Sequence, residues 1–175
     1  HALQQLARVH QGGGRQDEAI AALEKAIALT SPTNWMRAEL QSQLIRLHQR
    51  WHRTEELEER WTKYATGNPR DLGGYLQLIE LHERLGSQDK QREWLEKLVA
   101  LVPKNFDYRL RLARLLVEMD QYAAAAAKYD ELLAIQPTNL DVVFERARLD
   151  MLRAAEPAAR QRIAPLLALK PKDEA

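Results

Sequence analysis

Residues 105–137 of the chain read NFDYRLRLARLLVEMDQYAAAAAKYDELLAIQP, and this stretch decides the fold. Apolar residues recur at helical spacing on both sides of Asp120, which predicts two amphipathic helices joined by a short turn. Pro137 ends the stretch, because proline has no amide hydrogen to donate and its ring clashes with the preceding helical turn. The stretch therefore predicts a hairpin of two antiparallel helices.

The hairpin pattern repeats along the chain. Proline recurs every 34 residues, at Pro69, Pro103, Pro137 and Pro171, and a fixed period of this kind indicates a repeat architecture. No stretch alternates apolar and polar residues as a half-buried strand does, so we expect an all-α fold. The expected helices pair as 2–12 with 17–29, 32–51 with 54–66, 71–85 with 88–101, 105–119 with 122–134, and 139–154 with 157–169.

The quoted stretch resembles the tetratricopeptide repeat. Its first helix carries Leu112 beside the small Ala113, and its second carries Ala125 and then Tyr129, in the family's order of large and small residues. The other four stretches are similar, and the resemblance covers essentially the whole chain. It implies a right-handed superhelical solenoid of antiparallel helix pairs with about ten helices. The expected single domain spans 1–175, with units at about 1–33, 34–70, 71–104, 105–138 and 139–172.

The second unit departs from the 34-residue register. Ala19 and Leu57 are 38 residues apart, an excess of about one helical turn. We expect the extra turn in a longer helix that Ser31 caps and Pro32 begins, with Trp35 on it.

Other departures fall where the family has small or apolar residues. Larger or polar residues there lead us to expect looser packing in the second and third units. Arg146 and Asp150 replace apolar residues in the fifth unit. The residues that replace small ones are Ile45, Leu57, Ile79 and Gln91.

Composition excludes several classes of function. Lys and Arg number 26 against 25 for Asp and Glu, so the formal charge of +1 argues against a nucleic-acid partner. With 0 Cys, the chain has no disulfide and no thiolate site. No apolar run is long enough to span a membrane, so we expect no membrane partner, and the compartment stays open. Because the chain begins at His1 rather than Met, we expect it to be a piece of a longer protein.

Candidate chemical groups have simpler structural explanations. The run from Gly12 to Arg15 lacks the Lys and Ser or Thr of a phosphate-binding loop, so we expect a turn. His48 and His52 are four residues apart, as two metal ligands on a helix would be, but His10, His48 and His82 share one repeat position and favour packing between helices. We therefore expect no enzyme activity, no cofactor and no metal site.

The open faces of the first helices are the expected binding surface. In a stacked array these helices line the concave side, and arginine dominates their outward positions. Arginine suits carboxylates and apolar residues suit bulky side chains, so the predicted partner is a protein or peptide with acidic and apolar groups. Glu83, Glu118 and Glu145 dilute the positive charge of this face. The candidate site residues are Arg8, Arg46, Arg50, Glu80, Arg111, Arg114 and Arg148, with Leu76, Leu110 and Phe144.

Two alternatives to a peptide-binding scaffold stay open. Ile163 in the last helix leaves apolar surface that favours self-association through the C-terminal unit or further repeats, although Pro165 is expected to interrupt that helix. The chain could instead be a regulatory or recruiting segment of a larger, enzyme-containing protein. Some members of the family clamp the C-terminal carboxylate of chaperones, but Gln43, Gly73 and Gln77 do not reproduce that clamp.

Overall fold

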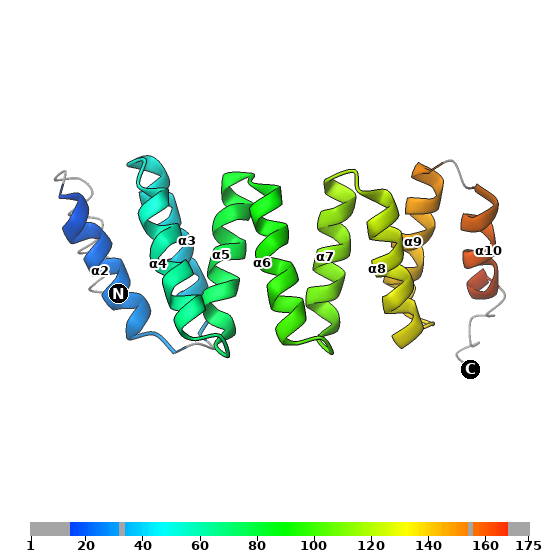
Figure 1. Cartoon of the computed structure of the whole chain (residues 1–175), viewed down its shortest axis with the longest axis horizontal. Helices are drawn as coiled ribbons and strands as arrows, with labels where there is room; N and C mark the ends of the chain where they lie inside the picture. The colour runs from blue at the N-terminus through cyan, green and yellow to red at the C-terminus, as the bar shows by residue number, and fades with distance from the viewer. Residues whose placement is uncertain (1–14, 32–33, 154–155, 168–175) are drawn as a thin grey trace, which may run out of the picture. The chain divides into compact units, whose positions relative to one another are not determined.

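The computed structural model describes residues 15–31, 34–153 and 156–167, and the regular structure in these residues is all helical (Figure 1). The predicted all-α fold is therefore confirmed. The chain divides into two compact units, His1–Leu81 and His82–Ala175. No helix within the described residues is long and apolar enough to cross a membrane.

The first unit contains α2 (Gln16–Ala28), α3 (Trp35–Arg50), α4 (Thr54–Gly67) and most of α5 (Leu72–Leu85). α3 packs against both α2 and α4. The core of the first unit includes Leu23, Ile45 and Leu57, which are fully buried. Gly74 lets α5 approach α4 closely, because a Cβ at this position would lie 3.0 Å from Cα of Ala65.

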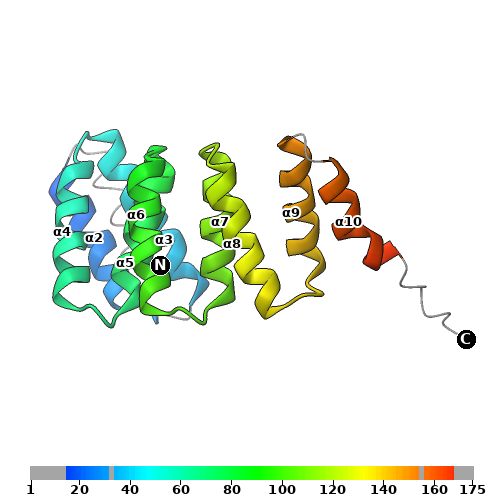
Figure 2. The same ribbon diagram turned by 45° about the vertical axis from the view of Figure 1, so that its right-hand side comes forward.

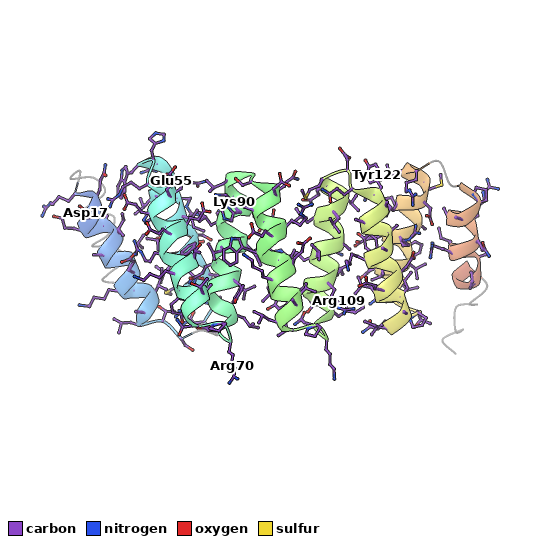
Figure 3. All side chains as sticks on the ribbon, viewed as in Figure 1. Asp17, Glu55, Arg70, Lys90, Arg109 and Tyr122 are labelled. Atoms are coloured by element: carbon purple, nitrogen blue, oxygen red, sulfur yellow. The ribbon has the colours of Figure 1, made fainter. Side chains whose placement is uncertain are left out.

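The second unit contains the last residues of α5, then α6 (Gln88–Leu101), α7 (Phe106–Glu118), α8 (Tyr122–Ile135), α9 (Leu140–Leu152) and α10 (Glu156–Leu167). Each of these helices from α6 onward packs against the next one, and Figure 2 shows α9 and α10 as neighbours from a second direction. Side chains fill the space between the helices of the α7–α8 hairpin, where Figure 3 labels Arg109 on α7 and Tyr122 at the start of α8.

Asparagine and aspartate side chains set the starts of the first helices. Asn105 accepts a hydrogen bond from the amide of Tyr108 at 3.0 Å, and Asn139 accepts one from Val142 at 3.3 Å. Asp71 likewise accepts a hydrogen bond from the amide of Gly73 at 2.8 Å. These caps satisfy amides that have no partner within the helix. Each cap stands two residues after a proline of the 34-residue register, so the proline and the cap together separate one hairpin from the next.

In three of the hairpins, the turn between the two helices contains one residue with a left-handed backbone conformation. His52, Gly86 and Asp120 have φ values of 56°, 67° and 57°, and they too are 34 residues apart. In each turn the following amide bonds back to the helix, for example Gln121 N to the Leu116 carbonyl at 2.8 Å. This is the usual hydrogen bond of a helix that ends in a left-handed residue. The sequence analysis found Asp120 at such a turn but not His52.

The start of α3 differs from the prediction. The helix begins at Trp35, and Asn34 caps it by accepting a hydrogen bond from the amide of Met36 at 2.9 Å. The predicted start at Pro32 is therefore wrong, although α3 has the expected extra length at 16 residues. Trp35 is 76% exposed. The expected break at Pro165 is also wrong, since α10 continues through it.

The residues that replace small ones in the family are accommodated in the core. Ile45, Leu57, Ile79 and Gln91 are all buried. His48 and His82 are buried as well, which is the structural role expected for their repeat position, while His10 lies outside the described residues.

Adding bulk at a buried position tests the repeat register assigned to the α7–α8 hairpin. Ala125 on α8 is completely buried, whereas its neighbour Ala124 is exposed. Ala125→Leu should lower the free energy of unfolding by about 1–3 kcal/mol, because added methylenes in a filled core force side chains out of their rotamers. Ala124→Leu is the matched control and should change it by less than about 0.5 kcal/mol. Urea denaturation followed by circular dichroism measures both, and equal stabilities would show that the register is wrong.

Acid should weaken the fold through His48. Burial lowers the pKa of this imidazole, and repulsion by Arg53 lowers it further, although the hydrogen bond between Nδ1 and the Leu44 carbonyl and the attraction of Glu56 act in the opposite direction. The pKa of a histidine in the unfolded chain is about 6.5, so the unfolded state takes up the proton first as the pH falls. The stabilising contribution is full above that value and is lost below it.

The variant His48→Phe removes this titration while keeping a bulky ring in the core. We expect the free energy of unfolding of the parent to fall more steeply than that of the variant between pH 7.5 and pH 5.5. Urea denaturation at the two pH values measures the difference. Identical pH dependence in parent and variant would contradict the role given to His48.

Candidate interaction surface

Two of the arginines predicted for the binding surface bind carboxylates on neighbouring first helices. Arg111 on α7 pairs with Glu83 on α5, with 2.6 Å between Nη2 and Oε2. Arg114 on α7 reaches Glu145 on α9, and its Nε lies 3.0 and 3.1 Å from the two carboxylate oxygens. Within the second unit, these arginines therefore join α7 to the last residues of α5 and to α9. The sequence analysis had assigned them to a ligand.

Glu145 is held from two helices. Tyr129 on α8 donates its hydroxyl to Glu145 Oε2 at 2.7 Å, and the same oxygen accepts from Nε of Arg114 at 3.1 Å. Burial alone would raise the pKa of Glu145, but hydrogen bonds from Arg114 and Tyr129 outweigh it, so the pKa lies below its ordinary value. Burial and the bond to Glu145 raise the pKa of Tyr129. The carboxylate is thus ionised at neutral pH and fixes α9 against the α7–α8 hairpin.

Arg148 is one helical turn beyond Glu145 and differs from the other two arginines. Among the described residues it makes no ion pair or side-chain hydrogen bond, and it is exposed. It lines a cavity of about 250 Å³ beside the Arg114–Glu145 pair. The other lining residues of this cavity are Val117, Glu118, Tyr129, Leu149 and Leu152.

Arg148 also borders a larger groove of about 730 Å³ between α9 and α10. Its walls are mostly apolar, and Phe144 and Met151 on α9 are 50% and 54% exposed there. The groove thus combines a cation without a partner among the described residues and exposed apolar side chains. The remaining lining residues are Ala147, Ala159, Arg160, Ile163 and Ala164.

A buried polar network holds α10 against α9. Arg146 and Asp150 on α9 bind each other, Arg146 Nε binds Asp130 on α8 at 3.0 Å, and Arg162 on α10 binds Asp150 at 2.8 Å. Burial alone would raise the pKa of Asp150, but the hydrogen bonds from Arg162 and Arg146 keep it below its ordinary value. The two departures that the sequence analysis noted in the fifth unit are therefore partners of each other. Arg162 and Asp130, which complete the network, had not been identified.

The remaining predicted site residues do not cluster at one place in the structure. In the first unit, exposed Arg46 pairs with Glu39 at 2.9 Å, and Glu80 accepts a hydrogen bond from Ser42 at 2.8 Å. Arg50 is exposed, and no side-chain partner of it is found within 15–31, 34–153 and 156–167. Leu76 in the first unit and Leu110 in the second are half-buried, and Arg8 lies outside the described residues. No group of three metal-ligating side chains occurs in the described part of the chain.

Sequence analysis named Ile163 on α10 as exposed apolar surface but missed the other groove residues of this helix. The 34-residue register could have found them, because Arg160, Ile163 and Ala164 stand 34 residues after Ala126, Tyr129 and Asp130. Those three earlier positions face α9 or are buried in the preceding hairpin. The signal available in the sequence was the change of side-chain polarity between equivalent positions, for example from Asp130 to Ala164.

Comparison with known proteins agrees with this architecture. Two profiles of the tetratricopeptide repeat match residues 72–115 and 1–32. None of the curated proteins compared with the chain matches it.

Solved structures match the fold over nearly the whole chain. A tetratricopeptide repeat protein from Parabacteroides merdae is 17% identical with a TM-score of 0.58, over 98% of this chain and 67% of that one. The protein MamA is 16% identical with a TM-score of 0.58, over 95% and 88%. A thermophilic repeat protein of Thermus thermophilus is 21% identical with a TM-score of 0.50, over 98% and 92%. At these identities the similarity establishes the fold alone.

Removing one member of the buried network should destabilise the second unit. Asp150→Ala leaves Arg146 and Arg162 without their shared carboxylate, and breaking a buried pair in this way costs about 3 kcal/mol. Asp141→Ala, on an exposed position of the same helix, removes the same charge and should cost less than about 1 kcal/mol. Urea denaturation measures both. Equal, small losses would show that the network does not hold α10.

Proposed function

The chain belongs to the tetratricopeptide-repeat family, and we propose that it is a protein-interaction scaffold that binds a protein segment on the faces of its first helices. The observation that carries the proposal is on α9. There Arg148 makes no ion pair or side-chain hydrogen bond with a described residue and lies beside the half-exposed Phe144. A cation next to exposed apolar side chains suits a partner segment with both acidic and bulky apolar groups.

The arginines of the second unit have different parts in this proposal. Arg111 and Arg114 shape the surface, because their guanidinium groups bind Glu83 and Glu145. Arg148 meets the carboxylate of the partner, while Phe144 and the half-buried Leu110 contact its apolar side chains. Charge speeds the encounter, and burial of the aromatic ring slows dissociation.

The first unit contributes a second contact region in the same proposal. Exposed Arg50 and Arg46 offer positive charge on α3, and Leu76 and Glu80 present apolar and acidic groups on α5. Arg8 is assigned to the same surface from its place in the repeat register. The scaffold needs no cofactor or metal, because binding alone is its activity.

Self-assembly is the alternative that a specific observation favours. The groove between α9 and α10 exposes Phe144 and Met151, and apolar surface of this kind also suits pairing with another copy. A recruiting role within a larger, enzyme-containing protein is compatible with the same surface, since recruitment too requires a bound partner.

Charge reversal at Arg148 tests the scaffold. With a partner obtained by affinity capture on the full chain, Arg148→Glu should weaken binding at least tenfold in calorimetric titration and reduce its sensitivity to salt. Phe144→Ala should weaken binding with little change in salt sensitivity. Lys104→Glu reverses a charge on an exposed loop of the same unit and should have no effect. A partner that responds to Lys104→Glu but not to Arg148→Glu binds elsewhere, and the proposal would then fail.

A further inference from the structure

We propose that the groove between α9 and α10 docks one amphipathic helix of a partner protein, in which a glutamate is followed by an apolar residue and, four positions after the glutamate, by a leucine. The inference rests on the proposed function and specifies its partner. It follows from a comparison of the last hairpin with the one before it, because α9 occupies the equivalent groove of the α7–α8 hairpin.

The 34-residue register relates the two grooves position by position. Phe144, Ala147, Arg148 and Met151 on α9 are equivalent to Leu110, Ala113, Arg114 and Val117 on α7. Ala159, Arg160, Ile163 and Ala164 on α10 are equivalent to Ala125, Ala126, Tyr129 and Asp130 on α8. Equivalent hairpin surfaces therefore occur twice in the second unit, with Ala147, Arg148 and Ala159 unchanged between them, and one of the two has a helix against it.

Exposure separates the occupied groove from the open one. Tyr129 is 2% exposed under α9, whereas its equivalent Ile163 is only half-buried. Leu110 and Val117 are half-buried, and their equivalents Phe144 and Met151 are about half exposed. The deepest positions do not differ, since Ala113 and Ala147 are both buried within their own hairpins. The open groove thus lacks the cover that a neighbouring helix gives.

Charge identifies what the missing helix carries. Arg114 binds Glu145 of the docked helix α9 through two carboxylate oxygens. Arg148 occupies the equivalent place and has no ion pair or side-chain hydrogen bond with any described residue. A carboxylate at the Glu145 position of a docked helix would complete the same charge-assisted contact.

The neighbouring positions define the rest of the pattern. Arg146 follows Glu145 on α9 and binds Asp130, but the equivalent of Asp130 in the open groove is Ala164, so an apolar residue fits there. Leu149 stands four residues after Glu145, is buried and faces the α7–α8 hairpin. Ile163 replaces Tyr129, which leaves Arg148 as the main contact of the incoming carboxylate.

A second copy of this chain fits the groove less well. Within the described helices, stretches with an acidic residue and apolar residues one and four positions later bury at least one of those apolar side chains in the chain's own core. On α8, for example, Glu131 is followed by Leu132, which is fully buried. The described helices thus favour another protein over a second copy as the source of the docked helix.

The docked helix α9 supplies a probe for the test. A fluorescein-labelled peptide with the sequence of residues 139–153, carrying Arg146→Leu and Asp150→Ala, presents Glu145 and Leu149 on one helical face. We expect it to bind the full chain in fluorescence anisotropy. Arg148→Gln in the chain should weaken binding about tenfold, and so should Glu145→Gln in the peptide.

The losses of affinity caused by Arg148→Gln in the chain and by Glu145→Gln in the peptide should not be additive. Together the two changes should weaken binding little more than either one alone, since each removes the same contact. Lys104→Gln in the chain is the matched control for charge and should leave the affinity unchanged. Circular dichroism should show nearly the parent melting temperature for Arg148→Gln, because the Arg148 side chain makes no ion pair or hydrogen bond with a described residue.

Three outcomes would overturn the inference. The first is peptide binding that ignores Arg148→Gln, the second is additive losses, and the third is a concentration-dependent dimer in sedimentation that the peptide disperses, because a second copy would then be the occupant. If the peptide fails to bind while a captured partner still responds to Arg148→Glu, the helix register is wrong and the scaffold function stands. If neither responds to Arg148, both proposals fail.

Discussion

Every feature of the second unit depends on one constraint, which is that a two-helix hairpin cannot bury both of its faces by itself. The α7–α8 hairpin buries one face internally through residues such as Ala113 and Ala125, and it needs α9 to cover the rest. The α9–α10 hairpin also buries small residues internally, Ala147 and Ala159, and it has an open face. Because stability in such an array comes from each pair of neighbours, the open face is also the place where new contacts add most.

Polar residues decide how neighbouring helices align, although they add little net stability. Apolar packing tolerates sliding of one helix along another, whereas the Arg114–Glu145–Tyr129 contact is satisfied in one position only. The network around Arg146 and Asp150 does the same for α10. Desolvation cancels much of the attraction within a buried ion pair, so the gain from these contacts is a fixed register. The same reasoning explains why an incoming helix should be selected by the position of its carboxylate.

The sequence predicted the helices well and their contacts poorly, for a physical reason. Helix ends are encoded locally, by Pro137 and Asn139 for example, and these signals can be found without knowledge of the fold. The start of α3 was misplaced because Ser31 and Asn34 are both good caps, and only backbone geometry distinguishes them. Ion pairs such as Arg111 with Glu83 join residues on different helices. An outward-facing arginine has the same helical spacing whether its partner lies in the chain or outside it.

That ambiguity explains why the proposed binding site lies at one end of the predicted arginine column in the second unit. An arginine at the Arg114 position is available to a ligand only where no following helix brings a carboxylate to it. Within the unit, α9 brings Glu145 to Arg114, and no described helix does so for Arg148. In the proposed function, a contact that stabilises the array between repeats thus becomes a recognition contact at the last described hairpin. Recognition there requires no new chemistry, because the groove keeps the equivalents of Ala113, Arg114 and Ala125, and Ile163 and Ala164 replace two polar side chains by apolar ones.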